Sequence, residues 1–279
     1  MQKVGLSVGY DYDIPMNEVI DLISKAGFDA ISPVWAPDDR LSSLVNYARH
    51  KGLIIQSLHA PFGKCSDLWS NDEAKSTVAV TELLKVLDDC ATLNIPILVC
   101  HAWIGFNYTQ EPNKIGLKNF QTIVDKANEL KIKIAFENTE GEEFLFVLFE
   151  HFKSYDNVGF CWDSGHEMCY NHSDDLLEKL GNLLIITHLN DNLGISDSEG
   201  KIFWTDDLHL LPFDGIADWD NNVKRLNNSS HLDILNFELS IKSKPNRHEN
   251  DKYMEMSLNE YFTEAYNRAR KIADAYETN

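Results

Sequence analysis

The sequence predicts an α/β protein built as one (β/α)8 TIM barrel. Short runs of β-branched and apolar residues alternate with longer amphipathic stretches from end to end, which is typical of βα units around a parallel sheet. The alternation completes eight cycles, and a length of 279 residues fits one barrel better than two ordinary domains. The chain has no low-complexity linker or break in composition. We therefore expect a single domain over residues 1–279.

Each cycle opens with a strand of four to six residues, rich in Ile, Val, Leu and Phe, as expected for strands covered on both faces. In chain order the expected strands are Lys3–Val8, Ala30–Val34, Ile54–His59, Ile97–His101, Ile134–Glu137, Val158–Trp162, Leu184–His188 and Ile234–Glu238.

The helices of the cycles are predicted from apolar residues at helical spacing and from their stop signals. Gly27, Gly52 and Asn94 each stand after a periodic run and before a strand, where a left-handed residue ends a helix. The expected helices are Met16–Ala26, Leu41–His50, Ala74–Leu93, Ile115–Leu130, Glu142–Phe152, Asp174–Leu180, Asp218–Leu226 and Leu258–Ala275.

The longest irregular stretches, 60–71, 190–215 and 240–257, all follow strands rather than helices. Loops that follow strands lie together at the C-terminal face of a barrel, where barrel enzymes hold their active sites. We therefore look for function at that face.

The composition disfavours nucleic acid as a partner. The net charge is −19, with 44 acidic and 25 basic residues, so the chain repels a phosphate backbone. The five cysteines are unclustered and lack CxxC spacing, which suits reduced thiols. We see neither a signal peptide nor an apolar stretch long enough to cross a bilayer, and expect a cytoplasmic protein without a membrane partner.

Polar side chains stand where the later strands end. In a barrel these positions converge on one axis, and carboxylates brought together there repel one another unless a cation is bound. Mixed imidazole and carboxylate ligands suit Zn, Mn, Fe or Co better than Ca, and the residue types do not choose among these four metals. The candidates are His59, His101, Glu137, Asp163, His166, His188 and Glu238, with Asp207 and His209 in the loop after the seventh strand.

The ordered segments LHAPF, CHAW, FEN, WDSGH, THLND, DLH, PFDG, DW and FELS resemble the xylose isomerase-like TIM-barrel superfamily. This superfamily joins sugar and sugar-phosphate isomerases and epimerases with endonuclease IV, and the likeness covers nearly the whole chain. Similarity to the epimerases implies one metal held by Glu137, Asp163, His188 and Glu238. It also implies that His166 and Glu143 contact the substrate.

The resemblance leaves two enzyme classes open. The three-zinc cluster of endonuclease IV would map onto nine residues of matching type, which keeps metal-dependent cleavage of abasic DNA as the alternative. These nine are His59, His101, Glu137, Asp163, His166, His188, Asp207, His209 and Glu238. A third class, a sensor that binds metal or sugar without turnover, has no sequence feature in its favour.

Three features favour the sugar reaction: the loops lack basic clusters, the segment APFGKCSDLWSND resembles the isomerase-like members, and aromatic residues follow the strand ends. We expect Trp35, Phe62 and Trp103 to contact the substrate. One departure is Gly194, which stands where the ketohexose 3-epimerases have an Arg.

The expected reaction is isomerisation or epimerisation of a sugar, sugar phosphate or related polyol ketone through a metal-stabilised enediolate. Glu137 and Glu238 are expected to transfer protons on opposite faces of the substrate. The substrate, its phosphorylation and the oligomeric state stay open.

Overall fold

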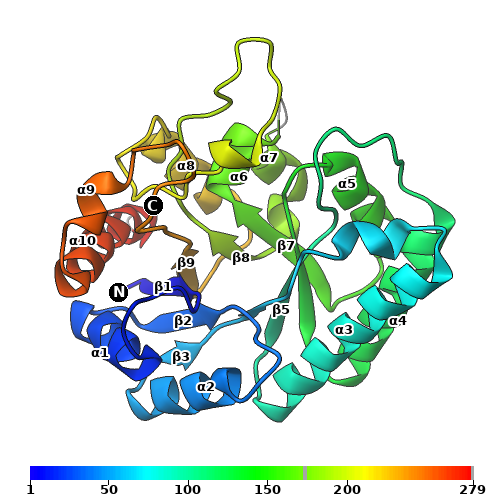
Figure 1. Cartoon of the computed structure of the whole chain (residues 1–279), viewed down its shortest axis with the longest axis horizontal. Helices are drawn as coiled ribbons and strands as arrows, with labels where there is room; N and C mark the ends of the chain where they lie inside the picture. Colours follow the sequence, from blue (N-terminus) through cyan, green and yellow to red (C-terminus); the bar gives the residue numbers. More distant parts are fainter. Residues whose placement is uncertain (172–174, 278–279) are drawn as a thin grey trace.

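The computed structural model describes residues 1–171 and 175–277, in which parallel strands form a barrel enclosed by helices (Figure 1). Four expected elements have the predicted bounds, and most others differ by one or two residues at an end. The third barrel strand is divided, because Gln56 and Ser57 interrupt its pairing. The strands are β1 (Lys3–Val8), β2 (Ala30–Pro33), β3 (Ile54–Ile55), β4 (Leu58–His59), β5 (Ile97–His101), β6 (Lys133–Glu137), β7 (Val158–Asp163), β8 (Leu184–His188) and β9 (Ile234–Phe237).

The strands form two parallel sheets that meet at two seams. One sheet has the order β3-β2-β1-β9 and the other the order β4-β5-β6-β7-β8. A single parallel bridge joins Val34 to His59 at the first seam, and another joins Leu189 to Phe237 at the second. At the second seam the Glu238 amide also donates to the carbonyl of Leu189 (3.1 Å). These bridges close the barrel.

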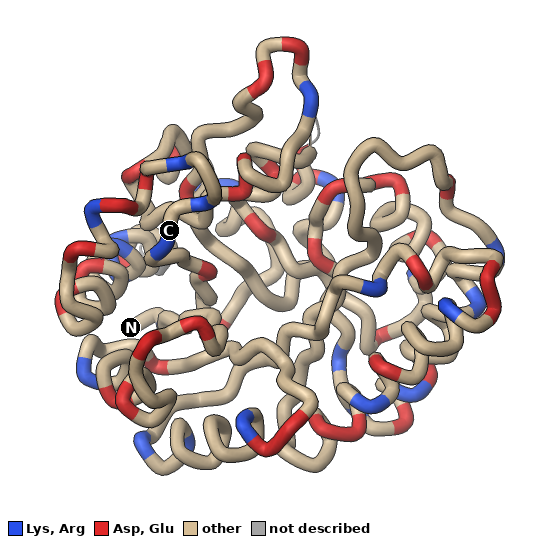
Figure 2. The backbone as a smooth tube through the Cα atoms, in the orientation of Figure 1, with Lys and Arg blue, Asp and Glu red and all other residues tan. Residues whose placement is uncertain are grey.

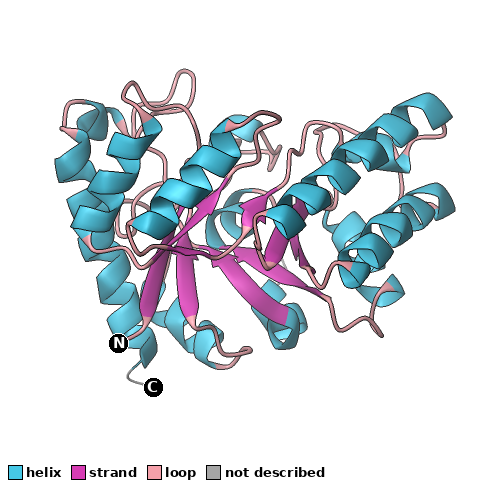
Figure 3. Cartoon of the chain, turned by 90° about the horizontal axis from the view of Figure 1, so that it is seen from below, coloured by secondary structure: helices cyan, strands magenta, loops and turns pink. Residues whose placement is uncertain are grey.

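Helices cover the outside of the strands (Figure 3). Gly27 ends α1 in the left-handed region (φ 112°), and Gly52 (φ 85°) before β3 and Asn94 (φ 52°) before β5 take the same region, so all three stop signals are confirmed. Asp174, the first residue of one expected helix, lies outside the described residues. The longer helices are α1 (Met16–Ala26), α2 (Arg40–His50), α3 (Glu73–Thr92), α4 (Lys114–Glu129), α5 (Glu142–His151), α8 (Trp219–Asn227) and α10 (Leu258–Glu277), and the shorter ones are α6 (Ser164–Cys169), α7 (Leu176–Leu180) and α9 (Asp251–Met254).

The barrel interior contains both apolar and polar side chains. Val99, Ala135, Cys161 and Ile186 form a small buried cluster within the five-stranded sheet. Polar groups also lie in the interior: the Gln56 amide donates to the carbonyl of Ile234 (3.3 Å), while Gln56 Oε1 has no hydrogen-bond partner among the described residues. The five cysteines are buried and unpaired, as expected from their spacing.

Charged residues are distributed around the outer helices and loops, with acidic segments more frequent than basic ones (Figure 2). Within the described ranges, no helix is both long enough and apolar enough to span a bilayer.

Candidate metal centre

The strand ends bring the predicted ligands together at one mouth of the barrel. His59, His101, Glu137, Asp163 and His188 are the last residues of β4, β5, β6, β7 and β8. His101 pairs with Glu137 across β5 and β6, and Asp163 pairs with His188 across β7 and β8, so each of these two strand pairs delivers neighbouring side chains. His59 pairs with Val99 and Glu137 pairs with Cys161, two residues before the last residue of the next strand. Glu238 follows β9 directly. His166 lies on α6, and Asp207 and His209 lie on the loop between β8 and α8.

Four of these residues form a central group. Glu137, Asp163, His188 and Glu238 each offer a ligand atom, and these atoms all lie within 4.8 Å of one another. The Nδ1 atom of His188 lies 3.0 Å from Glu137 Oε1 and 2.7 Å from Glu238 Oε2, so one imidazole nitrogen sits between two carboxylates from different sheets. This is the set expected to hold one metal ion.

Two further groups flank the central one. On one side Glu137 Oε2 lies 3.2 Å from His59 Nε2 and 3.4 Å from His101 Nε2. On the other side Asp163 groups with His166 and His209. The Oδ1 atom of Asp207 lies 2.7 Å from His209 Nε2 and 3.5 Å from His166 Nε2. All nine predicted residues are therefore brought into one connected constellation.

Two asparagines that the sequence analysis did not single out hold Asp163 in place. Asn138 accepts a hydrogen bond from the Asp163 amide (2.8 Å) and donates to its carbonyl (2.9 Å). Asn190 donates its side-chain amide to both carboxylate oxygens of Asp163, at 3.1 Å each. Asn138 directly follows the predicted ligand Glu137 in the FEN segment, and Asn190 lies two residues after His188 in the HLND segment. This closeness to predicted ligands is the sequence feature that could have identified them. Such supporting contacts orient metal ligands.

The buried polar atoms of the constellation fit a metal ion. Glu137 Oε2, Asp207 Oδ1 and His209 Nε2 are buried and have no hydrogen bond of good geometry to the described residues, although each lies near other ligand atoms. Buried polar atoms without partners are costly, and a cation among them would remove that cost. We therefore take the donor set as compatible with a divalent transition metal.

The site separates the pKa values of its carboxylates. Burial raises the pKa of Asp163 to about 6. Burial also acts to raise the pKa of Glu238, but the adjacent His188 outweighs it and holds that pKa at about 2. At Glu137, His188 and the hydrogen bonds from His101 and His59 together outweigh burial and keep its pKa well below the usual range. Glu137 and Glu238 are thus anionic at neutral pH, ready to bind a cation or accept a proton.

Cys161 is close enough to Glu137 and His188 to form a ligand group with them, which the sequence analysis did not propose. Burial raises the pKa of its thiol to about 12. A protonated thiol is a poor metal ligand, so this residue packs beneath the site as part of the barrel interior.

Metal affinity is expected to rise with pH. Below about pH 6 the metal-free protein carries a proton on Asp163, whose pKa burial raises to about 6. Burial opposes the charged form of His188, but the carboxylates of Glu137 and Glu238 outweigh it and raise its pKa well above the ordinary value. A cation must displace these protons. Metal affinity is therefore expected to fall by about tenfold per pH unit for each proton displaced, at pH values below the pKa of the group that carries it. Zinc titrations between about pH 5 and pH 8 test this; a constant affinity without proton release contradicts it.

The residues expected to contact the substrate lie at different places around the mouth. Phe62 stacks on the His101 ring (centroids 4.8 Å apart, 10° between planes), directly beside the ligand groups. Trp103 is buried and stacks on Phe144. Trp35 donates its indole N–H to Asp89 on α3 (2.7 Å).

Glu143, in the first turn of α5, accepts a hydrogen bond from the Tyr108 hydroxyl (2.8 Å). It belongs to none of the ligand groups found among the described residues.

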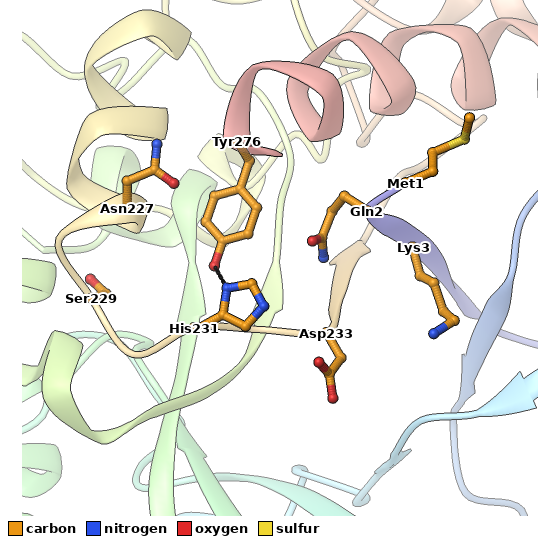
Figure 4. A pocket seen from close by; sticks show the side chains of 8 residues that line it. All are labelled: Met1, Gln2, Lys3, Asn227, Ser229, His231, Asp233 and Tyr276. Carbon is orange, nitrogen blue, oxygen red and sulfur yellow. Dashed lines mark hydrogen bonds between the residues drawn. The ribbon is translucent and has the colours of Figure 1, made fainter. Parts of the chain in front are cut away.

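A cavity of about 460 Å³ lies at the opposite end of the barrel, beside the first residues of β1 (Figure 4). His231 and Asp233 enter it from the segment before β9, and the Tyr276 hydroxyl lies 3.3 Å from His231 Nδ1. It contains none of the ligand groups found in the described part of the chain. The N-terminal ends of barrel strands ordinarily serve stability rather than chemistry.

Comparisons with known proteins agree with this architecture. An uncharacterized protein of Sinorhizobium fredii (strain NBRC 101917 / NGR234), y4fM, is 28% identical over an alignment that covers 94% of this chain and 90% of that protein. The crystal structure of the IolI protein with a bound zinc atom superposes with a TM-score of 0.74 at 19% identity, covering 100% of this chain and 99% of the other. D-psicose 3-epimerase in the presence of D-fructose gives a TM-score of 0.67 at 17% identity, covering 98% and 96%.

The sequence also matches the family described as Xylose isomerase-like TIM barrel over residues 20–258. The match spans most of the 279 residues and includes every ligand position described above. The chain therefore belongs to the xylose isomerase-like TIM barrel family.

Proposed function

We propose that the protein is a divalent-metal-dependent isomerase or epimerase of a sugar, sugar phosphate or related polyol ketone. The observation that carries the proposal is the central group of Glu137, Asp163, His188 and Glu238 at the C-terminal mouth of the barrel. The zinc atom in the IolI structure and the similarity of the fold to D-psicose 3-epimerase support it. Zn, Mn, Fe and Co all suit this ligand set.

When bound, the metal would polarise the substrate carbonyl and stabilise the negative charge that develops on its oxygen. Glu137 and Glu238 reach the site from β6 and from the end of β9, on either side of His188 Nδ1. Both carboxylates are anionic at neutral pH, because His188 holds their pKa values low against the effect of burial. Either one can therefore remove the proton from the carbon next to the carbonyl. The glutamate that delivers a proton to the opposite face must first take it from a substrate hydroxyl or from solvent.

The aromatic ring of Phe62 borders the same mouth and is 45% exposed. Because it stacks on His101, it presents an apolar surface next to the ligand groups. Apolar surface beside polar ligands suits the C–H faces of a sugar.

A second candidate function is metal-dependent hydrolysis of a phosphodiester in abasic DNA, and the two flanking ligand groups favour it. They place imidazole and carboxylate donors on both sides of the central group, as a site for several ions requires. The surroundings of the mouth argue against a DNA partner. Lys64 pairs with Glu82, Arg247 pairs with Asp206 and Glu249, and the net charge is −19. We therefore rank the sugar reaction first.

The proposed reaction is expected to exchange a carbon-bound hydrogen with solvent. The enediolate forms when a carboxylate removes this hydrogen from the substrate as a proton, and the resulting carboxyl proton exchanges with water, so turnover in heavy water should place deuterium on the carbon next to the carbonyl. The measurement is NMR of a panel of ketoses and inosose-like compounds incubated with metal-loaded protein. A parallel incubation with an abasic-site duplex tests the second candidate.

Two outcomes would contradict the proposal. Turnover that keeps the carbon-bound hydrogen in the product would contradict the enediolate mechanism and favour a hydride shift. Cleavage of the abasic duplex, with no sugar converted, would put the nuclease first. Metal-free protein is the control in both incubations.

A further inference from the structure

The structure separates the basic residues of the long loops into two kinds. Lys64 and Arg247 are paired with carboxylates, and the ammonium of Lys201 lies over the Phe203 ring. Lys242 and Lys244, which follow β9, line a cavity of about 360 Å³, although Lys244 is also paired with a carboxylate, that of Asp207. Small-molecule sites typically measure roughly 300–1,000 Å³, so this volume is enough for a ligand.

This loop cavity opens directly beside the central ligand group. Its lining includes Glu238 and His209 as well as the two lysines, with Ser7 from β1 and Asp11 from the segment after it. Among the described residues that line it, Asp11 and Glu238 are the acidic ones, and Glu238 belongs to the proposed metal site. A substrate whose carbonyl lies at the metal group therefore has room to extend past Glu238 toward the lysines.

Lys244 makes two contacts at the edge of this cavity. Its ammonium lies 3.1 Å from Asp207 Oδ2 and 5.7 Å from the centre of the Trp204 ring, so a carboxylate and an aromatic ring fix it. The same carboxylate also faces the imidazoles of His166 and His209 through its other oxygen. Beside this contact the Lys244 side chain keeps 24% of its surface exposed, so its ammonium can also approach an anionic group in the cavity.

Lys242 adds a second ammonium from the same loop. Its Nζ atom donates to the backbone carbonyl of Asp11 (3.0 Å), a neutral acceptor that directs the side chain toward the segment after β1. The residue is exposed, so its ammonium is accessible to a ligand that enters from solvent. Two ammonium groups at one cavity match the oxygens of a phosphate or carboxylate.

We propose that the loop cavity binds the end of the substrate remote from the carbonyl, and that Lys242 and Lys244 recognise an anionic group there. The substrate is thus a sugar that carries a phosphate or a carboxylate. This inference rests on the proposed function for the placement of the carbonyl.

The test compares three ketoses that differ at one carbon: D-fructose, D-fructose 6-phosphate and D-fructuronate. Their dissociation constants are measured by calorimetry with zinc-loaded wild type and the double variant Lys242→Gln, Lys244→Gln. Wild type should bind one of the anionic ketoses at least about tenfold more tightly than D-fructose, since charge-assisted contacts are the strong ones. The double variant should reduce this preference to about twofold or less. The anion that is preferred identifies the group as phosphate or carboxylate.

Lys201→Gln is the matched control, because it removes a lysine from a neighbouring loop outside the cavity. Thermal unfolding of each variant confirms that it folds. The proposal is overturned if neither anionic ketose is preferred, or if the preference survives in the double variant. Calorimetry detects binding whether or not the protein converts the sugar, so an anion preference in a protein that converts no sugar would retain the subsite and reject the proposed reaction. Conversion of D-fructose by a protein with no binding preference for either anionic ketose would support the proposed reaction and reject the anion subsite.

Discussion

Replacing Glu137 by glutamine is expected to remove tight metal binding. Glu137 belongs to three of the four ligand groups found in the described residues, and each of its carboxylate oxygens faces at least one imidazole nitrogen. Glutamine keeps the size of the side chain but loses the charge that balances a cation in this buried place. We expect the metal content after dialysis against a chelator to fall to about a tenth of the wild-type value or less, since even supporting contacts alter affinity by about 10–100-fold. Mass spectrometry of the metal measures it.

Glu140→Gln is the matched control for this experiment. Glu140 is also buried and lies three residues further along the same segment, where its Oε1 accepts a hydrogen bond from the Gly105 amide (2.7 Å). Glutamine retains an acceptor there, so this variant should keep its metal. If Glu137→Gln retained the wild-type metal content, Glu137 would not be a metal ligand shared by these groups.

Replacing Glu238 by glutamine is expected to reduce turnover by about 10²–10⁴-fold, the usual contribution of general acid–base catalysis. Three residues of the central group remain in this variant, namely Glu137, Asp163 and His188. It should therefore retain metal at reduced affinity while losing one of the two proton carriers. The measurement is kcat at saturating metal, together with deuterium exchange into recovered substrate. If deuterium still exchanges into the substrate while net conversion is lost, Glu137 can still remove and return a proton on its side of the substrate.

Glu249→Gln provides the comparison, because Glu249 lies on the same segment after β9 but pairs with Arg247. Its turnover should stay near the wild-type value. Full turnover in both Glu137→Gln and Glu238→Gln would exclude the proton-transfer pair.

The positions of the strand-end ligands could be predicted because a short apolar run fixes both the strand and its last residue. The apolar runs that end at His101 and His188 are short enough to define where each strand begins and ends, and the structure has both strands with the expected bounds. The interruption of the third strand could not be predicted. The sequence IIQSLH reads as one strand, but Gln56 turns its amide toward the carbonyl of Ile234 inside the barrel. That contact joins residues 178 positions apart.

The contacts that organise the site were less visible than the ligands. The amide groups of Asn138 and Asn190 reach Asp163 from neighbouring strand ends, and only the closed barrel brings these segments together. The short helix α6 was missed because six residues give no clear period; its N-terminus is set by Asp163, which accepts a hydrogen bond from the His166 amide (2.7 Å). The single-domain organisation and the roles of the site residues stay predictions.

A metal ion bound by the central group would hold the two sheets together at one seam of the barrel. One bridge ends at His59, and the other joins Leu189 to Phe237, directly before Glu238. Glu137, Asp163 and His188 belong to the five-stranded sheet, whereas Glu238 follows the last strand of the four-stranded one. An ion held by all four would link the two sheets across the second seam, and its binding free energy would oppose their separation. Loss of the ion would then loosen the molecule along one line, from the mouth downward between β8 and β9, rather than evenly throughout.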